Sequence, residues 1–568
     1  MKRFFLLGLF FILGLTLSAQ NIHLLLKGTT PHESRLIDSI GYVSKHKDTK
    51  SAYTQAKEVS TKLSQLGYLE NNVSDFNKQN DSTYASLISI GKQTKYLHLF
   101  LGTNETLKKI TTPNQLEDSL FIPFSKIQTF LDQTLQKAEQ KGLALTELKL
   151  DNIKHKNGIL YAEINFKSEK PRTINQIVAN YYNPNKLKDP LPKGHIKQLN
   201  KKYKNQIFNK SSIEKIYRDF EKFRFLTQTK YPETLLLKDT TKIYVYLEKR
   251  QSNTFDGYIG FNTDDNSKLT LNGYLDLTLE NTIKTGETFS IYWKSDGNNQ
   301  KTFRANLEIP YLFNSNFIFK SQLHIFKQDS IFQNTKTTLN FGYLINYNTR
   351  LYIGRQSTES SNTQITNTTT IQDYNNSYWT SDFEYHNLDY ERPFFPEKTT
   401  LSILFGIGKR SNINAFDTTQ TNQQHYINTK ASYTFECNKR NFIYVNQQNF
   451  YLKSNNYLIN ELYRFGGTSS IRGFTENRFQ AHFYSAIQTE YRYIVSPNLY
   501  LHSIVDYALY KDPLSGDKKL EPLTGVGFGI GLQTKNGLLK IALANGIEKA
   551  QKTDFYNTII SLNYNIHF

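Results

Sequence analysis

The feature that most constrains the fold is a strict alternation of apolar and polar residues in the second half of the chain. One clear example is the alternation of Leu269, Leu271, Leu275, Leu277 and Leu279 with Thr270, Asn272, Asp276, Thr278 and Glu280. Because successive side chains of a strand point to opposite faces, such a segment has one apolar face and one polar face. The segments are often about ten residues long and recur roughly every twenty, and about 9–11 residues is the length that a tilted strand needs to cross a bilayer.

About sixteen such segments are predicted, an even number as in most bacterial barrels. Their predicted starts are Thr254, Lys268, Glu287, Lys301, Phe317, Thr335, Thr349, Asn375, Thr399, Gln423, Asn441, Ala481, Asn498, Leu523, Gly537 and Asn557. Some connections are short, as at 314–316, and others are long, as at 358–374 and 453–480. This asymmetry favours a transmembrane antiparallel β-barrel over residues 251–568. A soluble sandwich of shorter strands has the same alternation and is the alternative.

The last predicted strand has the clearest pattern. Its apolar face consists of Ile560, Leu562, Tyr564, Ile566 and Phe568, and its polar face of Ser561, Asn563, Asn565 and His567. An apolar outward face with an aromatic at the membrane–water boundary is what contact with lipid requires. The pattern ending at Phe568 also resembles the C-terminal signal by which outer-membrane barrels are recognised for insertion.

Composition excludes several other classes of protein. The mean hydropathy is −0.56, and after the first twenty residues no stretch of about 18 apolar residues could span a membrane as a helix. Aromatic residues make up 14% of the chain, whereas disordered chains are poor in them. The net charge of +19 does not concentrate in basic runs interleaved with aromatics, so we expect surface and lumen charge and no nucleic-acid partner.

The N-terminus predicts export. Lys2 and Arg3 precede an apolar run from Phe4 to Leu17, and small residues follow at 18–19. This is the pattern of a secretory signal peptide over residues 1–19, because the run is short for the alternative, a membrane anchor. Cys437 is the only cysteine, which excludes an intramolecular disulfide and a multi-cysteine metal site. We expect no metal and no cofactor.

The segment between the predicted leader and the barrel repeats. Three stretches have helical periodicity, with apolar faces of Ala52, Ala56, Val59, Leu63 and Leu66, then Ile127, Phe130, Leu131 and Ala138, then Ile213, Ile216, Tyr217 and Phe220. The first two end at Gly67 and Gly142. Each stretch is followed by strand-like segments, so we predict three α+β domains at 20–101, 102–170 and 171–250, each with a strand, two helices and two strands. Their sheet edges would suit strand addition by an extended client.

A glycine-rich motif lies in the long loop between the eleventh and twelfth predicted strands. It reads Phe465-Gly466-Gly467-Thr468-Ser469-Ser470-Ile471-Arg472-Gly473-Phe474. Here the chain resembles the BamA/TamA-type superfamily of outer-membrane assembly and translocation proteins, which have periplasmic POTRA domains before a sixteen-stranded barrel. In that family the sixth extracellular loop carries a (Val/Ile)-Arg-Gly-(Phe/Tyr) motif, matched here by Ile471 to Phe474, with Gly466 and Gly467 matching the upstream glycines. The acidic residues of the family's next two strands are matched by Glu490 and Asp506.

The physical chemistry of these residues supports a contact between loop and barrel wall. Glu490 and Asp506 alternate with apolar neighbours, so both should face the lumen. Arg472 offers a planar fork of donors to carboxylates, and Gly473 permits close approach of the backbone. One face of a later strand has no side chains, because four glycines occupy its alternate positions, Gly525, Gly527, Gly529 and Gly531. We expect the loop to pack against this face. The alternative is that Arg472 only holds the loop and has no direct role in insertion.

The chain has no motif of catalysis. A Gly-x-Ser-x-Gly elbow, a His-Glu-x-x-His pair and a phosphate loop are all absent from the sequence, so we predict a protein that is not an enzyme. The resemblance implies assembly of proteins into the bacterial outer membrane, with POTRA domains in the periplasm receiving unfolded clients. It implies outer-membrane lipid and a possible periplasmic or inner-membrane protein as further partners.

The barrel seam is the predicted insertion site. It would join the first strand, in which Asp256, Gly257 and Gly260 weaken β-pairing, to the last strand with Tyr564, Ile566 and Phe568. Two alternatives stay open at this point. One is a two-partner-type secretion pore whose client passes through the lumen, and the other is a passive outer-membrane channel, against which the N-terminal repeats argue.

Overall fold

The structure is a computed structural model that describes residues 22–112, 117–181, 191–263, 269–296, 300–364, 370–390, 392, 394–413, 419–515, 519–548 and 558–568. The predicted leader at 1–19 lies outside these residues. The chain divides into two compact units. One comprises Met1–Thr173 with Ile207–Ser212, and the other comprises Ile174–Gln206 with Ile213–Phe568. The third α+β sheet therefore belongs to the same unit as the barrel.

The first α+β domain contains a small sheet with two helices. Its elements are β1(Ile22–Gly28), α2(Pro31–Ile40), β2(Lys45–His46), α3(Thr49–Gln65), β3(Asn72–Val73), β4(Asn77–Lys78) and β5(Thr83–Ser89), in the sheet order β2-β1-β5-β3 with β4 beside β5. A capping box at Thr30 and the side chain of Asp48 begin the two helices by accepting backbone N–H bonds. Four of the five residues predicted for the apolar face of α3 are buried in the core of this domain. The fifth, Leu66, follows the last residue of the helix and is exposed, so its inclusion in the face was wrong.

The second domain has the same central pairing. Its elements are β6(Tyr96–Phe100), α4(Glu105–Thr111), β7(Ser119–Pro123), η1(Phe124–Lys126), α5(Ile127–Gln140), β8(Glu147–Lys156) and β9(Ile159–Lys167), in the order β7-β6-β9-β8. Gly67 and Gly142 follow α3 and α5 with φ of 97° and 87°, the left-handed region that commonly ends a helix. Compared with the predicted strand–helix–helix–strand–strand order, the first domain has β2 between its helices and one additional strand after them, and the second domain has β7 between its helices.

The third domain matches that order. It consists of β10(Gln176–Tyr181), α6(Lys193–Tyr203), α7(Lys210–Glu221), β11(Leu226–Leu236) and β12(Thr241–Lys249), with the sheet order β10-β12-β11. Asp219 of α7 accepts hydrogen bonds of 2.7 Å from Lys202, Tyr203 and Lys222, which ties the two helices together. Burial alone would raise the pKa of the Asp219 carboxyl, but these three hydrogen bonds outweigh it and hold the pKa below its usual value. In all three domains the first strand pairs in parallel with the last.

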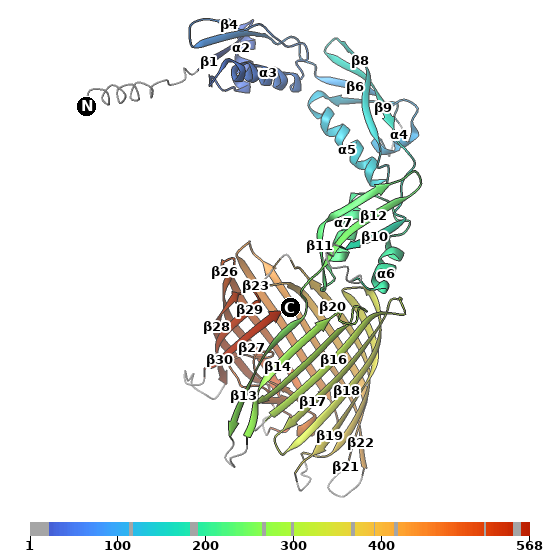
Figure 1. Cartoon of the computed structure of the whole chain (residues 1–568), viewed down its shortest axis with the longest axis vertical. Coiled ribbons are helices and arrows are strands. Elements are labelled where there is room, and N and C mark those ends of the chain that lie inside the picture. The colour runs from blue at the N-terminus through green and yellow to red at the C-terminus, as the bar shows by residue number, and fades with distance from the viewer. Residues whose placement is uncertain are drawn as a thin grey trace, which may run out of the picture. The chain divides into compact units, whose positions relative to one another are not determined.

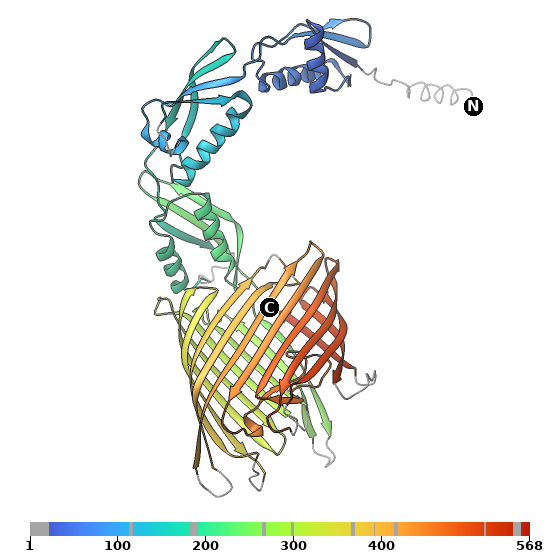
Figure 2. The ribbon, with the colours of Figure 1, turned by 180° about the vertical axis from the view of Figure 1, so that it is seen from behind.

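The remainder of the chain forms a closed antiparallel barrel of sixteen strands (Figures 1 and 2), which confirms the predicted architecture. The strands are β13(Thr254–Thr263), β14(Leu269–Glu280), β15(Thr288–Asp296), β16(Gln300–Leu312), β17(Phe317–Gln328), β18(Phe332–Asn346), β19(Thr349–Asn362), β20(Tyr374–Leu388), β21(Glu397–Ile413), β22(Thr419–Glu436), β23(Asn441–Lys453), β26(Phe483–Ser496), β27(Leu499–Lys511), β28(Glu521–Gln533), β29(Gly537–Glu548) and β30(Ile559–His567). The largest difference from prediction is at β22, expected from Gln423 and observed from Thr419.

The barrel wall has an apolar exterior and a polar interior. Outward side chains such as Ile353, Trp379 and Phe528 are 64–66% exposed in the isolated chain, whereas inward neighbours such as Tyr352 and Thr380 are buried. The alternation along strands such as β18, β19 and β20 has the period of two that a wall with lipid on one side and a lumen on the other requires. Among the helices of the described residues, none is long and apolar enough to cross a bilayer.

A buried histidine connects the third α+β domain to the barrel. The His195 ring of α6 is fully buried, with its centroid 4.7 Å from that of Tyr311, 5.8 Å from that of Tyr347 and 5.1 Å from that of Phe223. Gly286 lies so close that a Cβ there would stand 2.6 Å from Nε2 of His195. Burial, with a smaller contribution from the charge of Arg350, lowers the pKa of His195 to about 3, so the ring is neutral.

Candidate functional site

The candidate site is a long loop that is attached to the inner surface of the barrel. It runs from the end of β23 to the start of β26 and contains η2(Ile459–Glu461) and a short hairpin of β24(Tyr463–Phe465) and β25(Phe479–Ala481). Gly466 and Gly467 follow β24 with φ of 120° and 90°, which only glycine adopts readily. They turn the chain sharply, and an isolated bridge between Gly467 and Ile471 closes the turn.

Arg472 lies at the centre of this site. Its backbone N–H and its Nε donate to Oδ2 of Asp506 at 3.0 and 2.8 Å, and its Nη2 donates to Oδ1 at 2.5 Å. Nη1 is paired with Glu490, which comes from the neighbouring strand β26. Asp506 on β27 is only 1% exposed. The structure thus brings together the three charged residues that the sequence singled out, and charge-assisted bonds of this kind are the stronger hydrogen bonds.

Glu490 has a second cationic partner that the sequence reasoning missed. Nε of Arg492 donates to Oε2 of Glu490 at 2.7 Å. The carboxylate therefore bridges a loop arginine and a wall arginine. Strand parity could have revealed Arg492, since it is two residues from Glu490 and so on the same face.

The flanking residues of the motif are packed. Ile471 and Phe474 are 0% and 2% exposed. They belong to a cluster of inward side chains contributed by the loop hairpin and by β26, β27 and β28, namely Phe465, Ala481, Tyr484, Ala486, Ala508, Tyr510 and Leu523. Full burial of a large apolar side chain stabilises by about 1.5–3 kcal/mol. The loop is therefore held to the wall by apolar packing as well as by ion pairs.

Only part of the predicted glycine face receives the loop. A Cβ at Gly525 would collide with the carbonyl oxygen of Arg472, so the loop does pack there. Gly529 and Gly531 instead accommodate the rings of His502 and Tyr500 on the neighbouring strand, and Gly527 is close to the backbone of Leu543 on β29. The expectation was wrong for these three glycines, because neighbours within the wall already fill the space beside them.

A glycine on the next strand also lies against the loop. Gly546 of β29 lies directly opposite Gly525, and a Cβ there would stand 2.6 Å from both the carbonyl oxygen of Gly473 and the ring of Phe474. A Cβ at Gly473 would in turn collide with the backbone of Asn545. The motif therefore crosses two adjacent strands at backbone contact distance, which explains why glycines occur on both sides.

A second ion pair fixes the other end of the loop. Arg410 of β21 and Glu461 of η2 form a salt bridge in which the side chains are 0% and 2% exposed. Arg410 also bonds to the Oδ1 of Asn456, and Nε2 of Gln424 donates to Glu461 at 2.8 Å. The sequence reasoning missed this pair. The alternation of residues along β21 could have revealed it, because this alternation places Arg410 on the inward face of the strand. A buried inward arginine needs a carboxylate partner.

The barrel closes at a narrow seam between β13 and β30. Among the described residues, only two pairs join these strands, Thr254 with His567 and Phe255 with Ile566. By contrast, ten pairs join β13 to β14 and eight join β29 to β30. Beyond β30, the backbone N–H of Phe568 donates to the carbonyl of Asn253 at 3.0 Å.

The predicted seam residues lie on both sides of this junction. Oδ1 of Asp256 accepts the backbone N–H of Tyr564 at 3.2 Å and the hydroxyl of Tyr274 at 2.6 Å, so a side chain takes the place of a ladder bond. Gly257 pairs with Leu275, and a Cβ there would stand 2.6 Å from a carbonyl oxygen. Gly260 is opposite Asn272 in the same ladder. Ile566 is in the seam pairing itself, whereas Phe568 follows β30 and is 48% exposed.

The fold and the site together define a β-barrel protein with N-terminal α+β domains and a loop fixed inside the barrel. The barrel has sixteen strands, a lumen loop anchored by two ion-pair clusters and a weakly paired seam, and α+β domains precede it. The described residues contain no group of three or more His, Cys, Asp or Glu side chains that could hold a metal.

Comparison with solved structures identifies the fold. CdiB from Acinetobacter baumannii is similar over 90% of this chain and 97% of its own length, with a TM-score of 0.50 and 13% identity. CdiB from Escherichia coli matches 91% of this chain and 98% of its own at 10% identity, with a TM-score of 0.48. BamA from Haemophilus ducreyi lacking POTRA domains 1–3 matches 82% and 98% at 14% identity, with a TM-score of 0.47.

The likeness to the Acinetobacter protein is one of fold, and it extends from the barrel into the α+β domains because it covers 90% of the chain. This chain therefore has the fold of that protein, with α+β domains followed by a closed sixteen-stranded barrel, which is the architecture predicted from the sequence. The sequence matches no protein-family model and no curated protein.

Proposed function

We propose that this chain is an outer-membrane protein that inserts unfolded protein clients into the membrane at its barrel seam. The observation that carries the proposal is the difference between two residue pairs at β13–β30 and eight to ten at the adjoining ladders. Every second pair of an antiparallel ladder exchanges two backbone hydrogen bonds, so a junction with fewer pairs has fewer bonds and opens at lower cost than the two ladders beside it.

An opened seam would offer a template. Strand β13 extends to Thr263, eight residues past the last pair with β30 at Phe255. In lipid, unsatisfied backbone groups cost several kcal/mol each, so a client strand that paired with this edge would be stabilised strongly. Burial of the client barrel supplies the driving force, and the proposal needs no nucleotide, cofactor or catalytic group.

The α+β domains would receive the client before insertion. Strands such as β8(Glu147–Lys156) lie at the edge of their sheets, and an extended chain can add to such an edge through main-chain hydrogen bonds. We propose that these domains lie in the periplasm, where they would also contact periplasmic or inner-membrane proteins. The anchored loop, which crosses the lumen face of several strands, argues against an open passive channel.

A disulfide across the seam tests the proposal. In a Cys437→Ser background, Thr254→Cys and His567→Cys would place two thiols on directly opposite residues, within reach of a disulfide. We expect oxidation to stop insertion of client barrels into proteoliposomes and reduction to restore it. The matched control is Thr278→Cys with Ser290→Cys, an opposed pair in the β14–β15 ladder that should not affect insertion when oxidised.

The same variants distinguish insertion at the seam from secretion through the lumen. A locked seam that still permits release of a secreted client through the lumen would favour a secretion pore. Full insertion activity with the seam locked would overturn the proposal. Depletion followed by proteomics of the outer membrane adds an independent result: broad loss of barrels supports general assembly, loss of one secreted protein supports a dedicated transporter, and no loss contradicts both.

A further inference from the structure

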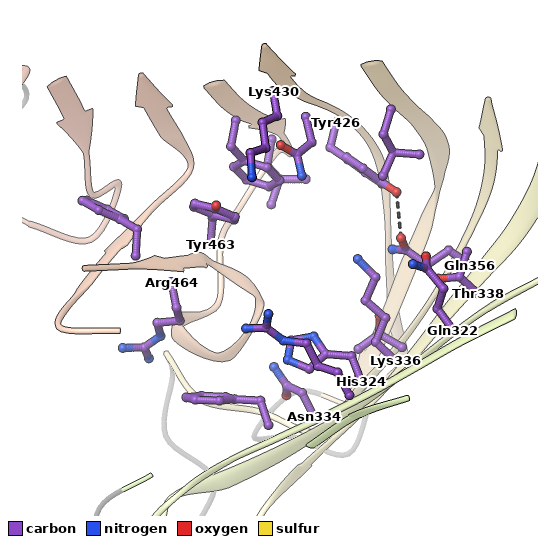
Figure 3. Close-up of a pocket in the computed structure, with 18 of the residues that line it drawn as sticks. Gln322, His324, Asn334, Lys336, Thr338, Gln356, Tyr426, Lys430, Tyr463 and Arg464 are labelled. Atoms are coloured by element: carbon purple, nitrogen blue, oxygen red, sulfur yellow. Dashed lines mark hydrogen bonds between the residues drawn. The ribbon is translucent and has the colours of Figure 1, made fainter. Parts of the chain in front are cut away.

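A cavity in the barrel lumen lies between the wall and the anchored loop. Its volume is about 650 Å³, within the range of small-molecule sites. The wall strands β16 to β23 line one side, and Tyr463 to Gly466 of the loop line another. Figure 3 shows His324, Lys336 and Lys430 projecting from the wall toward a common open space, with Tyr463 and Arg464 of the loop at its edge.

The cavity contains a row of basic side chains on adjacent strands. Arg304 of β16 is directly opposite His324 of β17, which is directly opposite Lys336 of β18. Lys430 of β22 and Arg464 of β24 line the same space.

The acidic side chains that line the cavity are already paired with other cations. Lys320 contacts Glu384 and lies 3.7 Å from Asp382. Glu476 pairs with Lys294 at 3.0 Å, and Glu461 pairs with the buried Arg410. None of these carboxylates neutralises the row of basic residues.

Apart from Lys320, the basic side chains of the cavity have no carboxylate partner among the described residues. Some of them lie over aromatic rings: Arg304 is 5.1 Å from the ring centroid of Tyr292, and Lys336 is 6.0 Å from that of Tyr426. Arg464 lies 5.7 Å from the ring of Phe332, and its buried Nε has no hydrogen-bond partner. Cation–π contacts of this kind offset only part of the cost of desolvating a charge.

We propose that the lumen cavity binds a small polyvalent anion that carries phosphate or carboxylate groups. Such an anion would neutralise Arg304, Lys336 and Lys430 together, and phosphate and carboxylate oxygens are the acceptors that arginine and lysine recognise. Because Arg464 and Tyr463 belong to the loop, a bound anion would also connect the loop to the wall. The site is independent of whether a client is inserted or secreted.

The test uses the full chain purified in detergent at low ionic strength, with pyrophosphate and citrate as separate probes in isothermal titration calorimetry. We expect saturable binding of one anion per chain. Lys336→Gln and Lys430→Gln should each weaken binding by about tenfold or more, since each removes a charge-assisted bond. Lys409→Gln is the matched control, because Lys409 is exposed on the opposite face of the wall.

The two probes distinguish phosphate from carboxylate ligands, and either result supports the site. Correct folding is checked by heat-modifiable gel mobility, and Lys430→Gln carries the test if Lys336→Gln does not fold. Absence of saturable binding by both anions would overturn the proposal, as would equal binding by the cavity variants and the control. Binding of a polyglutamate peptide without binding of either small anion would also overturn it, in favour of an acidic protein segment.

Discussion

Arg472 donates three hydrogen bonds to the carboxylate of Asp506, one from its backbone and two from its guanidinium. Both the position of the loop and the orientation of the arginine side chain are thus set by one buried carboxylate on β27. Since Glu490 pairs with the same guanidinium, the arginine joins two adjacent strands to the loop. The pairing indicates that Arg472 has a structural role in holding the loop. Any role of Arg472 in insertion would depend on that structural role.

The first prediction is that Arg472→Ala destabilises the barrel by about 3–5 kcal/mol, because it leaves the buried carboxylate of Asp506 without a cationic partner. The measurement is the urea dependence of heat-modifiable gel mobility. Adding Asp506→Asn should recover part of the loss, since it neutralises the carboxylate left unpaired. Adding Glu490→Gln as well should recover less, because Arg492 would lose its partner. Arg440→Ala is the control, because Arg440 is exposed in a turn. Wild-type heat stability in the single variant would contradict the prediction.

The second prediction concerns backbone contact at the motif. Gly473→Ala should prevent the loop from packing, because the new Cβ would collide with the backbone of β29 in addition to the strain of a φ of 90°. Gly102→Ala separates the two effects, since Gly102 has a φ of 68° and a Cβ added there would meet no atom within 4 Å. We expect a loss of about 1–2 kcal/mol for the control and a larger loss for Gly473→Ala.

Proteolysis of the loop provides the readout for this comparison. A detached loop in Gly473→Ala should be cleaved at 453–483 under conditions that leave the wild-type chain intact. Equal protease resistance of Gly473→Ala and wild type would show that the backbone of β29 shifts to accommodate the methyl group.

The barrel was predictable because the pattern that defines each strand depends only on residues that are close together in the sequence. The alternation at 269–280 sets strand and face without reference to the rest of the chain. The charged contact of Arg472 followed from the parity of Glu490 and Asp506 together with the family motif. The contact of His195 with Tyr311 could not be predicted, because it depends on how a helix of one domain meets turns that are distant in sequence.

The third prediction concerns the buried pair at the other end of the loop. Glu461→Gln should destabilise the barrel by about 3–5 kcal/mol, because Arg410 would become an uncompensated charge at a position with no exposed surface. Glu359→Gln is the matched control, since Glu359 is exposed on the outer face of β19. The measurement is the urea midpoint of both variants, and equal midpoints would mean that solvent or another group compensates Arg410.

The last prediction is a dependence of the α6–barrel contact on pH. The folded pKa of His195 is about 3, whereas a histidine released to water has a pKa of about 6.5. The released state therefore binds a proton that the packed state excludes, so the contact is fully stable above about pH 6.5 and weakens progressively as the pH falls toward about 3. Both ring nitrogens are buried without a hydrogen-bond partner among the described residues, so no acceptor is available to stabilise the charged ring.

Hydrogen exchange of α6 at about pH 7.5 and about pH 5 measures this effect, with rates corrected for the intrinsic dependence of exchange on pH. Protection of Lys193–Tyr203 should decrease at the lower pH in the wild-type chain. His195→Phe removes the titrating group while keeping an aromatic ring among Tyr311, Tyr347 and Phe223, so its protection should be the same at both values. An equal decrease in that variant would assign the effect to another group, and the coupling between His195 and the barrel turns would then have no electrostatic origin.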